Sequence, residues 1–281
     1  MKGTSKMEFT ELDTKQLQVA KRLLENPGLA ARITNLVGMP IEKGLELLPD
    51  KWSQSISGIT QAALMKAANA AIFTMKDIPG EESSNIWHKF GVAVSGGVGG
   101  YFGLAGVSIE LPISTSIMLR SIADVARSEG ESISSVHTKM ACLEVFALGG
   151  KSRSDDGVET GYYSVRYVLS NSVAEATQFI IEHGFGHNAA PAIIKFITKI
   201  AEHFGVQVTQ KAAAQAIPAI GAVGGAVINT LFIDHFQDMA RGHFIVRKLE
   251  RSYGEEQVKI LYESLPLHEQ LSDRLHDRLS H

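Results

Sequence analysis

Two long stretches of this chain carry almost no charge. The thirty residues between Lys89 and Arg120 contain a single charged residue, Glu110, and the twenty-two residues between Lys211 and Asp234 contain none. Each stretch reaches the length of about 20 residues that an α-helix needs to cross a bilayer. These stretches restrict the fold more than any other feature, because they must be buried in a protein core, in lipid or against a partner.

Small residues recur every four positions in both stretches, which places them on one face of a helix. These rows comprise Gly91, Ser95, Gly99 and Gly103 in the first stretch, and Gly221 and Gly225 in the second. The seven glycines between residues 91 and 106 would cost an isolated helix about 5–7 kcal/mol relative to alanine. Close approach of another backbone would offset this loss, so both rows predict a packing face or a membrane face.

Three environments are compatible with such helices: a hairpin that spans the bilayer, a peripheral contact with the membrane, or a buried helix pair in the centre of a soluble bundle. Glu110 and Pro112 interrupt the first stretch, and Pro218 and Asn229 interrupt the second. A carboxylate at the centre of the bilayer costs about 2.5–3.5 kcal/mol on insertion scales. A homo-oligomer whose Ala/Gly faces meet between subunits is a further alternative, and the sequence leaves all of them open.

The rest of the chain follows the helical period. Leu17, Ala20 and Leu24 form an apolar stripe after Asp13 and Thr14, which are typical residues at the start of a helix. No alternating strand pattern bounded by hairpin turn residues is present. The sequence therefore predicts an all-α fold, a single multi-helix bundle around the two weakly charged Gly/Ala-rich helices. After the first helix, the expected helices cover about 29–37, 40–48, 50–67, 83–105, 110–129, 132–148, 158–182, 191–203, 206–217, 219–252 and 254–263.

The composition excludes several function classes. The chain has 27 basic and 30 acidic residues and a net charge of -3, so it lacks the excess of positive charge that binding to nucleic acid requires. The single cysteine, Cys142, cannot form an intramolecular disulfide or a cysteine-based zinc site, which is typical of a reducing compartment. The first residues lack the apolar core of a secretory signal, so we expect a cytoplasmic protein.

Several ionisable residues lie within apolar helical stretches, where an unpaired charge is costly. The candidates for a divalent-metal or acid–base site are Glu110, Glu144, Asp234, His235 and His243. The candidates for buried ion pairs are Arg120, Asp124, Arg247 and Glu250. Arg120 and Asp124 are four residues apart, and Arg247 lies within one turn of both His243 and Glu250, so local pairs are expected. The Glu-x-x-His pair of di-iron bundles is absent, which favours structural ion pairs over a metal site.

Five segments of the chain together resemble the EcsC protein family. They are LPDKW at 48–52, SIELPISTSIMLRSIADVARSEG at 108–130, CLEVFALGG at 142–150, GYYSVR at 161–166 and HFGVQVTQKAAAQAIPAIGAVGGAVINTLFIDHFQDMARGHFIVRKLERSYG at 203–254. The resemblance implies a bacterial helical protein associated with membrane and secretion functions, in a family named for its place beside an ABC-transporter pair. It carries no set of catalytic residues. Its recurring polar positions fall on Glu110, Arg120, Asp124, Glu144, Arg166, Asp234, His235, His243, Arg247 and Glu250.

The resemblance divides the chain into an EcsC-like helical domain at 46–263, N-terminal helices at 1–45 that are specific to this protein, and a charged tail at 264–281. We expect a non-enzymatic protein that acts at the cytoplasmic face of the bacterial membrane, peripheral to the inner membrane. Its expected partner is membrane lipid or a membrane protein such as an ABC transporter, with no cofactor. The alternative is a metal-dependent, hydrolase-like enzyme with a carboxylate/His site inside the bundle.

Overall fold

The computed structural model describes residues 8–25, 28–38, 40–69, 103–150, 161–184, 190–217 and 221–267, the side chains of 37, 103–106 and 221–226 excepted. Every regular element in these ranges is helical, which confirms the predicted all-α fold. The elements are α1 (Glu11–Glu25), α2 (Leu29–Val37), α3 (Glu42–Leu45), α4 (Trp52–Ala67), α6 (Gly103–Ser128), α7 (Val136–Glu144), the 3₁₀ helix η2 (Val145–Ala147), α8 (Tyr162–His183), α9 (Pro191–Ala216), α10 (Gly221–Tyr253) and α11 (Glu255–Ser264).

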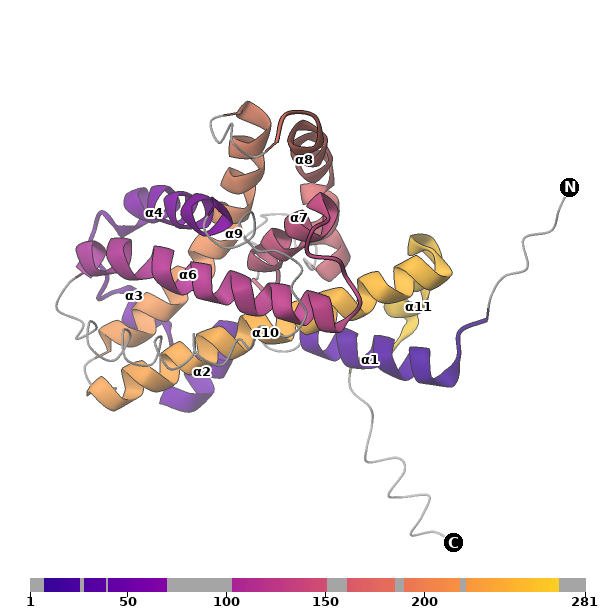
Figure 1. The fold of residues 1–281 in the computed structure, drawn as a ribbon. Helices are drawn as coiled ribbons and strands as arrows, with labels where there is room; N and C mark the ends of the chain where they lie inside the picture. Colours follow the sequence, from indigo (N-terminus) through magenta and orange to yellow (C-terminus); the bar gives the residue numbers. More distant parts are fainter. Residues whose placement is uncertain are drawn as a thin grey trace, which may run out of the picture.

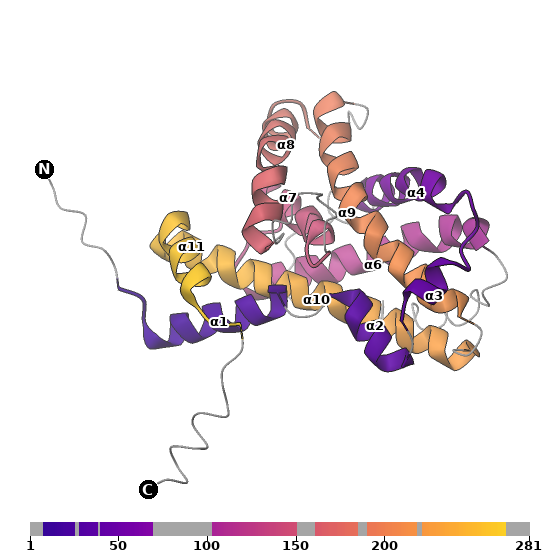
Figure 2. The same cartoon turned by 180° about the vertical axis from the view of Figure 1, so that it is seen from behind.

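The helices form a bundle around α10, which at 33 residues is the longest helix of the described chain. α6 packs against α10, α4 packs against both α6 and α9, and α1 packs against the half of α10 nearer its C-terminal end. α8 leads away from α10 and α9 returns toward it, so that these two helices form a projecting antiparallel pair (Figures 1 and 2).

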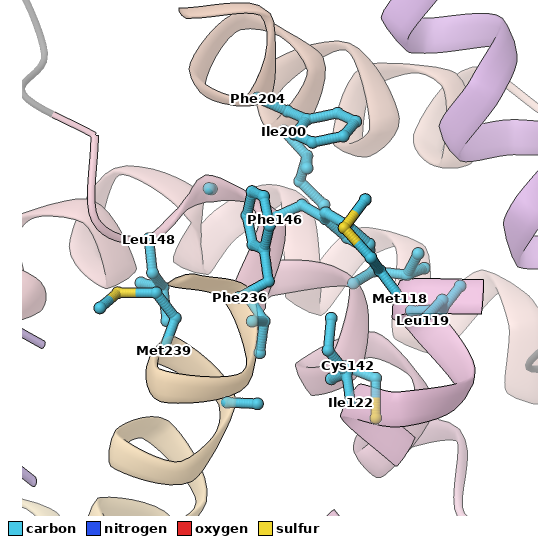
Figure 3. Close-up of a cluster of buried hydrophobic side chains, with 14 of the residues drawn as sticks. Met118, Leu119, Ile122, Cys142, Phe146, Leu148, Ile200, Phe204, Phe236 and Met239 are labelled. Carbon is cyan, nitrogen blue, oxygen red and sulfur yellow. The ribbon is translucent and has the colours of Figure 1, made fainter. Parts of the chain in front are cut away.

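The core lies where α6, α7, η2, α9 and α10 meet (Figure 3). Phe146 of η2, Phe204 of α9 and Phe236 of α10 are almost fully buried, and their ring centroids lie 4.9 to 5.6 Å apart. Cys142 is also buried in this region, and burial raises the pKa of its thiol, so the residue packs as a small apolar side chain. Burial of large side chains from several elements gives the bundle one continuous core.

Some expected helix boundaries are wrong. The first helix begins at residue 11, because Thr10 rather than Asp13 or Thr14 caps it: the Asp13 backbone N–H donates to Thr10 Oγ1 at 3.1 Å. Residues 191–216 form one continuous helix instead of two. Gly205 lies inside it and faces α4, where an added Cβ would make only an ordinary contact, 3.7 Å from Thr60 Oγ1. Packing of α9 against α4 thus continues the helix through a glycine that local propensity disfavours.

The helix that contains Glu110 and Pro112, expected at 110–129, also differs from the expectation at its start. Pro112 was expected in a first turn, but α6 already begins at residue 103 and continues through Pro112. Of the two glycine rows, Gly91, Ser95 and Gly99 lie outside the described residues, and Gly103, Gly221 and Gly225 lie in the first turns of α6 and α10. Figures 1 and 2 show that α6 and α10 begin at the same end of the molecule. This end, with Ile109, Ile113 and Val227, is called the α6/α10 end below.

None of the helices in the described ranges is both long enough and apolar enough to cross a bilayer.

Candidate functional site

A cavity of about 810 Å³ lies along one face of α8. Its other walls come from α7, α10 and α11. The α8 residues in its lining recur at intervals of three or four positions, which is the spacing of one helix face. They include Tyr163, Arg166, Ser170, Val173, Thr177 and Ile181. This volume is within the range of about 300–1,000 Å³ that is common for small-molecule sites, so the α8 cavity is the candidate functional site.

Glu144, the last residue of α7, contributes its carboxyl group to the wall of the α8 cavity. Only 9% of its side chain is exposed. No described residue forms a hydrogen bond with this carboxyl group, and the nearest basic atom is His243 Nε2, 3.9 Å from Glu144 Oε2. Burial raises the pKa of Glu144, although the positive charges of Arg166 and Arg247 oppose this effect. Burial therefore disfavours the charged form of Glu144 relative to an exposed glutamate.

His243 lies behind Glu144 and is fully buried in α10. Its Nδ1 is 2.9 Å from the Tyr162 hydroxyl. Burial lowers the pKa of His243 far below its ordinary value, and Arg166 and Arg247 lower it further, so the ring is neutral. When the Tyr162 hydroxyl donates to Nδ1, the ring proton is on Nε2, the atom that faces Glu144 and has no hydrogen-bond partner in the described chain. Tyr162 thus orients the His243 ring behind the cavity wall, with Nε2 toward Glu144.

Arg166 supplies the first of two guanidinium groups near Glu144. Its two terminal nitrogens donate to both carboxylate oxygens of Glu250, at 2.6 and 3.1 Å, and the Tyr163 hydroxyl donates to the same carboxylate at 3.2 Å. The guanidinium group also lies over the rings of Tyr162 and Tyr163, 5.3 and 5.5 Å from their centroids. This two-point pairing holds Arg166 in place and leaves the pair without net charge.

Arg247 supplies the second guanidinium group. Its Nε donates to Glu131 Oε1 at 2.9 Å, and Arg251 also contacts Glu131. Thr138 donates to the other oxygen, Oε2, at 2.9 Å. Burial alone would raise the pKa of Glu131, but the hydrogen bonds from Arg247 and Thr138 reverse this effect and lower it. Two arginines share one carboxylate, so this group of side chains carries one excess positive charge beside the cavity.

The five candidate metal ligands are divided among separate places. Glu144 and His243 approach each other as described, whereas Glu110 pairs with Lys211 Nζ at 2.7 Å. His235 is buried elsewhere on α10, where its Nε2 lies 3.5 Å from Gln207 Nε2, and Asp234 lies one residue before it. Within the described ranges, no group of three or more His, Cys, Asp or Glu side chains is placed to hold a metal ion.

The four expected ion-pair residues lie near charges of opposite sign, but their closest partners differ from the expected ones. Asp124 contacts Arg127 at 3.4 Å, one turn further along α6, and the charge of Arg120 acts on it as a weaker electrostatic interaction. Arg247 pairs with Glu131 and Glu250 pairs with Arg166, each across two different elements. Residues four apart on one helix can always meet, so sequence spacing suggests such pairs even where tertiary contacts offer a better-oriented partner.

Three residues of this region were not among the expected site residues: Glu131, Tyr162 and Thr177. Glu131 lies in a polar connection between helices, where no periodic pattern marks it. Tyr162 belongs to the GYYSVR segment, which was noted for the family resemblance alone. Thr177 is only 4% exposed, lines the α8 cavity and has no hydrogen-bond partner for Oγ1 in the described chain. The one sequence feature that could have identified Thr177 is that it is a polar residue on the apolar face of α8.

A second surface feature lies at the α6/α10 end. Ile109 and Ile113, four residues apart on α6, are 71% and 50% exposed. Glu110, the single charge in this part of α6, is held by Lys211, so it places no uncompensated charge beside them. Ile113 also borders a hollow of about 240 Å³ that Lys66 and Arg120 line. This surface is apolar with two basic residues at its edge.

Comparison with known proteins identifies one family. No curated protein and no solved structure matches the chain. The model of the EcsC protein family matches residues 12–249. The match begins in α1, so it includes N-terminal helices that the motifs quoted above leave outside the family-like domain, and it ends close to the end of α10. Since this range is far more than half of the 281 residues, the chain belongs to the EcsC protein family.

Proposed function

We propose that this protein is a non-enzymatic docking protein that acts at the cytoplasmic face of the bacterial membrane, through contacts with lipid or with a membrane protein. The observation that carries the proposal is the exposed pair Ile109 and Ile113 on a helix whose nearby charge is neutralised. Isoleucine side chains exposed four residues apart present one apolar face, and covering this face lowers the free energy because apolar surface is removed from water.

Charge at the α6/α10 end supports a membrane surface as the environment. Lys66 and Arg120 lie in the lining of the hollow beside Ile113. Basic residues next to exposed apolar side chains are typical of proteins that bind at the interface of anionic membranes, where each contributes about 1 kcal/mol of attraction. The described parts of the two uncharged stretches are residues 103–119 of α6, residues 212–216 at the end of α9 and residues 221–233 of α10, and the starts of α6 and α10 lie at this end (Figure 1).

Vesicle flotation tests the proposal. The wild-type protein should float with vesicles of phosphatidylglycerol and phosphatidylethanolamine, or with bacterial membrane vesicles that retain their proteins if the partner is a membrane protein. The double variant Ile109→Glu/Ile113→Glu should bind at least about tenfold more weakly, because two isoleucines that the membrane would cover are replaced by two charges.

The matched control replaces two apolar residues of similar exposure on other helices. Leu12 on α1 and Ile260 on α11 are 66% and 60% exposed. The variant Leu12→Glu/Ile260→Glu adds the same charge and should still float. Equal loss in both double variants would show that added negative charge alone prevents binding. Absence of wild-type binding to both kinds of vesicle would contradict the proposed function.

A further inference from the structure

The α8 cavity contains polar groups that the protein itself does not satisfy. Glu144 and Thr177 line it with side chains that are more than nine-tenths buried, and neither side chain has a hydrogen-bond partner among the described residues. A buried polar group without a partner costs about 1–3 kcal/mol, so the fully buried Thr177 Oγ1, with the Glu144 carboxyl group on the same wall, indicates that a ligand completes the site.

The charges around the cavity favour an anion at its inner end. Arg247 uses Nε on Glu131, and no side chain in the described part of the chain bonds to its two terminal nitrogens. Since Arg251 shares Glu131, the positive charge of Arg247 is only partly compensated. Glu144 is nearby, and burial raises the pKa of its carboxyl group. The inner end therefore offers the two terminal nitrogens of Arg247 and their positive charge to a bound group.

The acidic residues of the cavity are placed differently. Glu182 and Glu255 have side chains that are 51% and 73% exposed, and Glu256 is also exposed, so water and salt screen their charges. Arg166 is neutralised by Glu250. Glu255 also lies 3.9 Å from Arg166, so the acidic residues offset part of the positive charge of the lining, and Arg247 and Lys259 are the basic residues that remain to attract an anion.

The wall between these ends is largely apolar. Val173, Ala174 and Ile181 follow one another along the cavity face of α8, and Tyr163 lies beside Arg166. Residues 163 and 181 are 18 positions apart, which is about 27 Å along a helix. An elongated cavity with donors at one end and apolar side chains along its wall fits a molecule that has one anionic group and an apolar body.

We propose that the α8 cavity binds a small organic anion, a carboxylate or a phosphate monoester with an apolar chain, whose anionic group is held by Arg247 on the part of the wall that Glu144 also lines. This site is separate from the surface of the proposed docking function, because α11 and the α6/α10 end lie at opposite ends of α10 (Figures 1 and 2). Loss of one function therefore does not entail loss of the other.

Isothermal titration calorimetry on the full chain tests the site with four probes: octanoate, octyl phosphate, inorganic phosphate and octylamine. Saturable binding of octanoate or octyl phosphate, with octylamine at least about tenfold weaker, is the expected result. Octylamine that binds as tightly as the anions would overturn the charge assignment. Inorganic phosphate that binds as tightly as octyl phosphate would overturn the role of the apolar wall. No saturable binding of any anionic probe would overturn the proposal.

Two kinds of variant separate the site from effects on folding. Arg247→Gln should weaken octanoate or octyl phosphate binding by about tenfold or more, as expected for the loss of a charged hydrogen bond. Because Arg247 also pairs with Glu131, its thermal unfolding is measured in parallel. Ala174→Trp adds bulk at an exposed position of α8 that lines the cavity, and it should abolish binding.

Val168→Trp is the matched control for Ala174→Trp. Val168 is also exposed on α8, at 53%, but it does not line the cavity. This variant should bind the probes as the wild type does. If Ala174→Trp is folded and still binds with unchanged affinity, the ligand does not occupy the α8 cavity and the proposal fails.

Discussion

His235 and His243 are buried in α10, and both are held neutral by their surroundings. Burial lowers the pKa of His235 from 6.5 to about 3, and the charge of Arg32 lowers it further. Burial has the same effect on His243, with Arg166 and Arg247 adding to it. Each buried ring has a polar neighbour: the Tyr162 hydroxyl lies 2.9 Å from His243 Nδ1, and Gln207 Nε2 lies 3.5 Å from His235 Nε2. These contacts orient the two neutral rings.

The first prediction concerns acid stability. Below pH 6.5 the unfolded chain takes up a proton at His235, whereas the folded protein does so only near pH 3. The stabilising effect of the neutral ring is therefore complete above pH 6.5 and is lost as the pH falls toward 3. The free energy of unfolding, measured by urea denaturation, should decrease between pH 7 and pH 4.5. His235→Gln should decrease less steeply, because one of the two titrating histidines is gone. Parallel curves for both proteins would contradict this explanation.

At the scale of helices, several close contacts are made by glycines outside the two expected rows, whose own surroundings lie outside the described part of the chain. A Cβ on Gly242 of α10 would lie 2.7 Å from Leu24 Cγ and 3.1 Å from the Ala20 carbonyl oxygen of α1. A Cβ on Gly44 of α3 would lie 2.1 Å from the Ala213 carbonyl oxygen of α9. The packing role assigned to small residues is thus present, but isolated glycines carry it at these contacts, without a four-residue repeat.

The second prediction uses a matched pair of glycines. Gly242→Ala should lower the free energy of unfolding by about 1–3 kcal/mol, because the added methyl group separates α1 from α10. Gly58 is exposed within α4, and a Cβ added to it would have no neighbouring atom within 4 Å. Gly58→Ala should therefore raise the free energy of unfolding by about 0.5–1 kcal/mol through helix propensity. Urea denaturation measures both, and a stabilised Gly242→Ala would refute the close contact.

At the scale of the whole molecule, the first and the last described helices are joined. Lys21 of α1 is buried, and its Nζ donates to the backbone carbonyl oxygens of Tyr262 at 2.7 Å, Glu263 at 3.3 Å and Leu265 at 2.6 Å. These carbonyls lie at the C-terminal end of α11, where a cation also complements the helix dipole. One lysine therefore fixes α11 to α1, although about 240 residues separate them in the sequence.

The third prediction follows from this contact. Lys21→Met keeps most of the side-chain volume but leaves three carbonyl groups without their donor, so it should cost about 1.5–3 kcal/mol of unfolding free energy. Hydrogen exchange of the α11 amides should become faster, because the end of this helix loses its attachment. Lys15→Met is the control, since Lys15 contacts only the exposed Glu11, and it should change neither measurement. Unchanged exchange in Lys21→Met would show that apolar packing alone holds α11.

The approximate positions of most helices could be predicted because they depend on residues close together in the sequence. Apolar residues at intervals of three and four mark α1, α8 and α10, and Pro191 at the first turn of α9 was expected where it is found. The starts of α1 and α6 and the continuity of α9 were not predictable. They depend on a cap at Thr10 and on contacts such as that of Gly205 with α4, which periodicity alone does not reveal.

The candidate site shows the same division. Glu144, His243, Arg247 and Glu250 were singled out because charge on an apolar helix is costly wherever the helix lies. Their partners were not identified: Glu250 binds Arg166 and Arg247 binds Glu131, over separations of 84 and 116 residues. The sequence identifies charged residues that are costly to bury, but it does not identify the residues that compensate their charge.

The sequence by itself determined the all-α class, the membership of the EcsC protein family and the two stretches without charge, because each follows from residues close together in the chain. Only the tertiary structure decided which charges meet and where unsatisfied groups line a cavity. It also decided which glycines bring helices into close contact. These properties depend on distances between side chains of different helices, and such distances exist only once the core has placed the helices side by side.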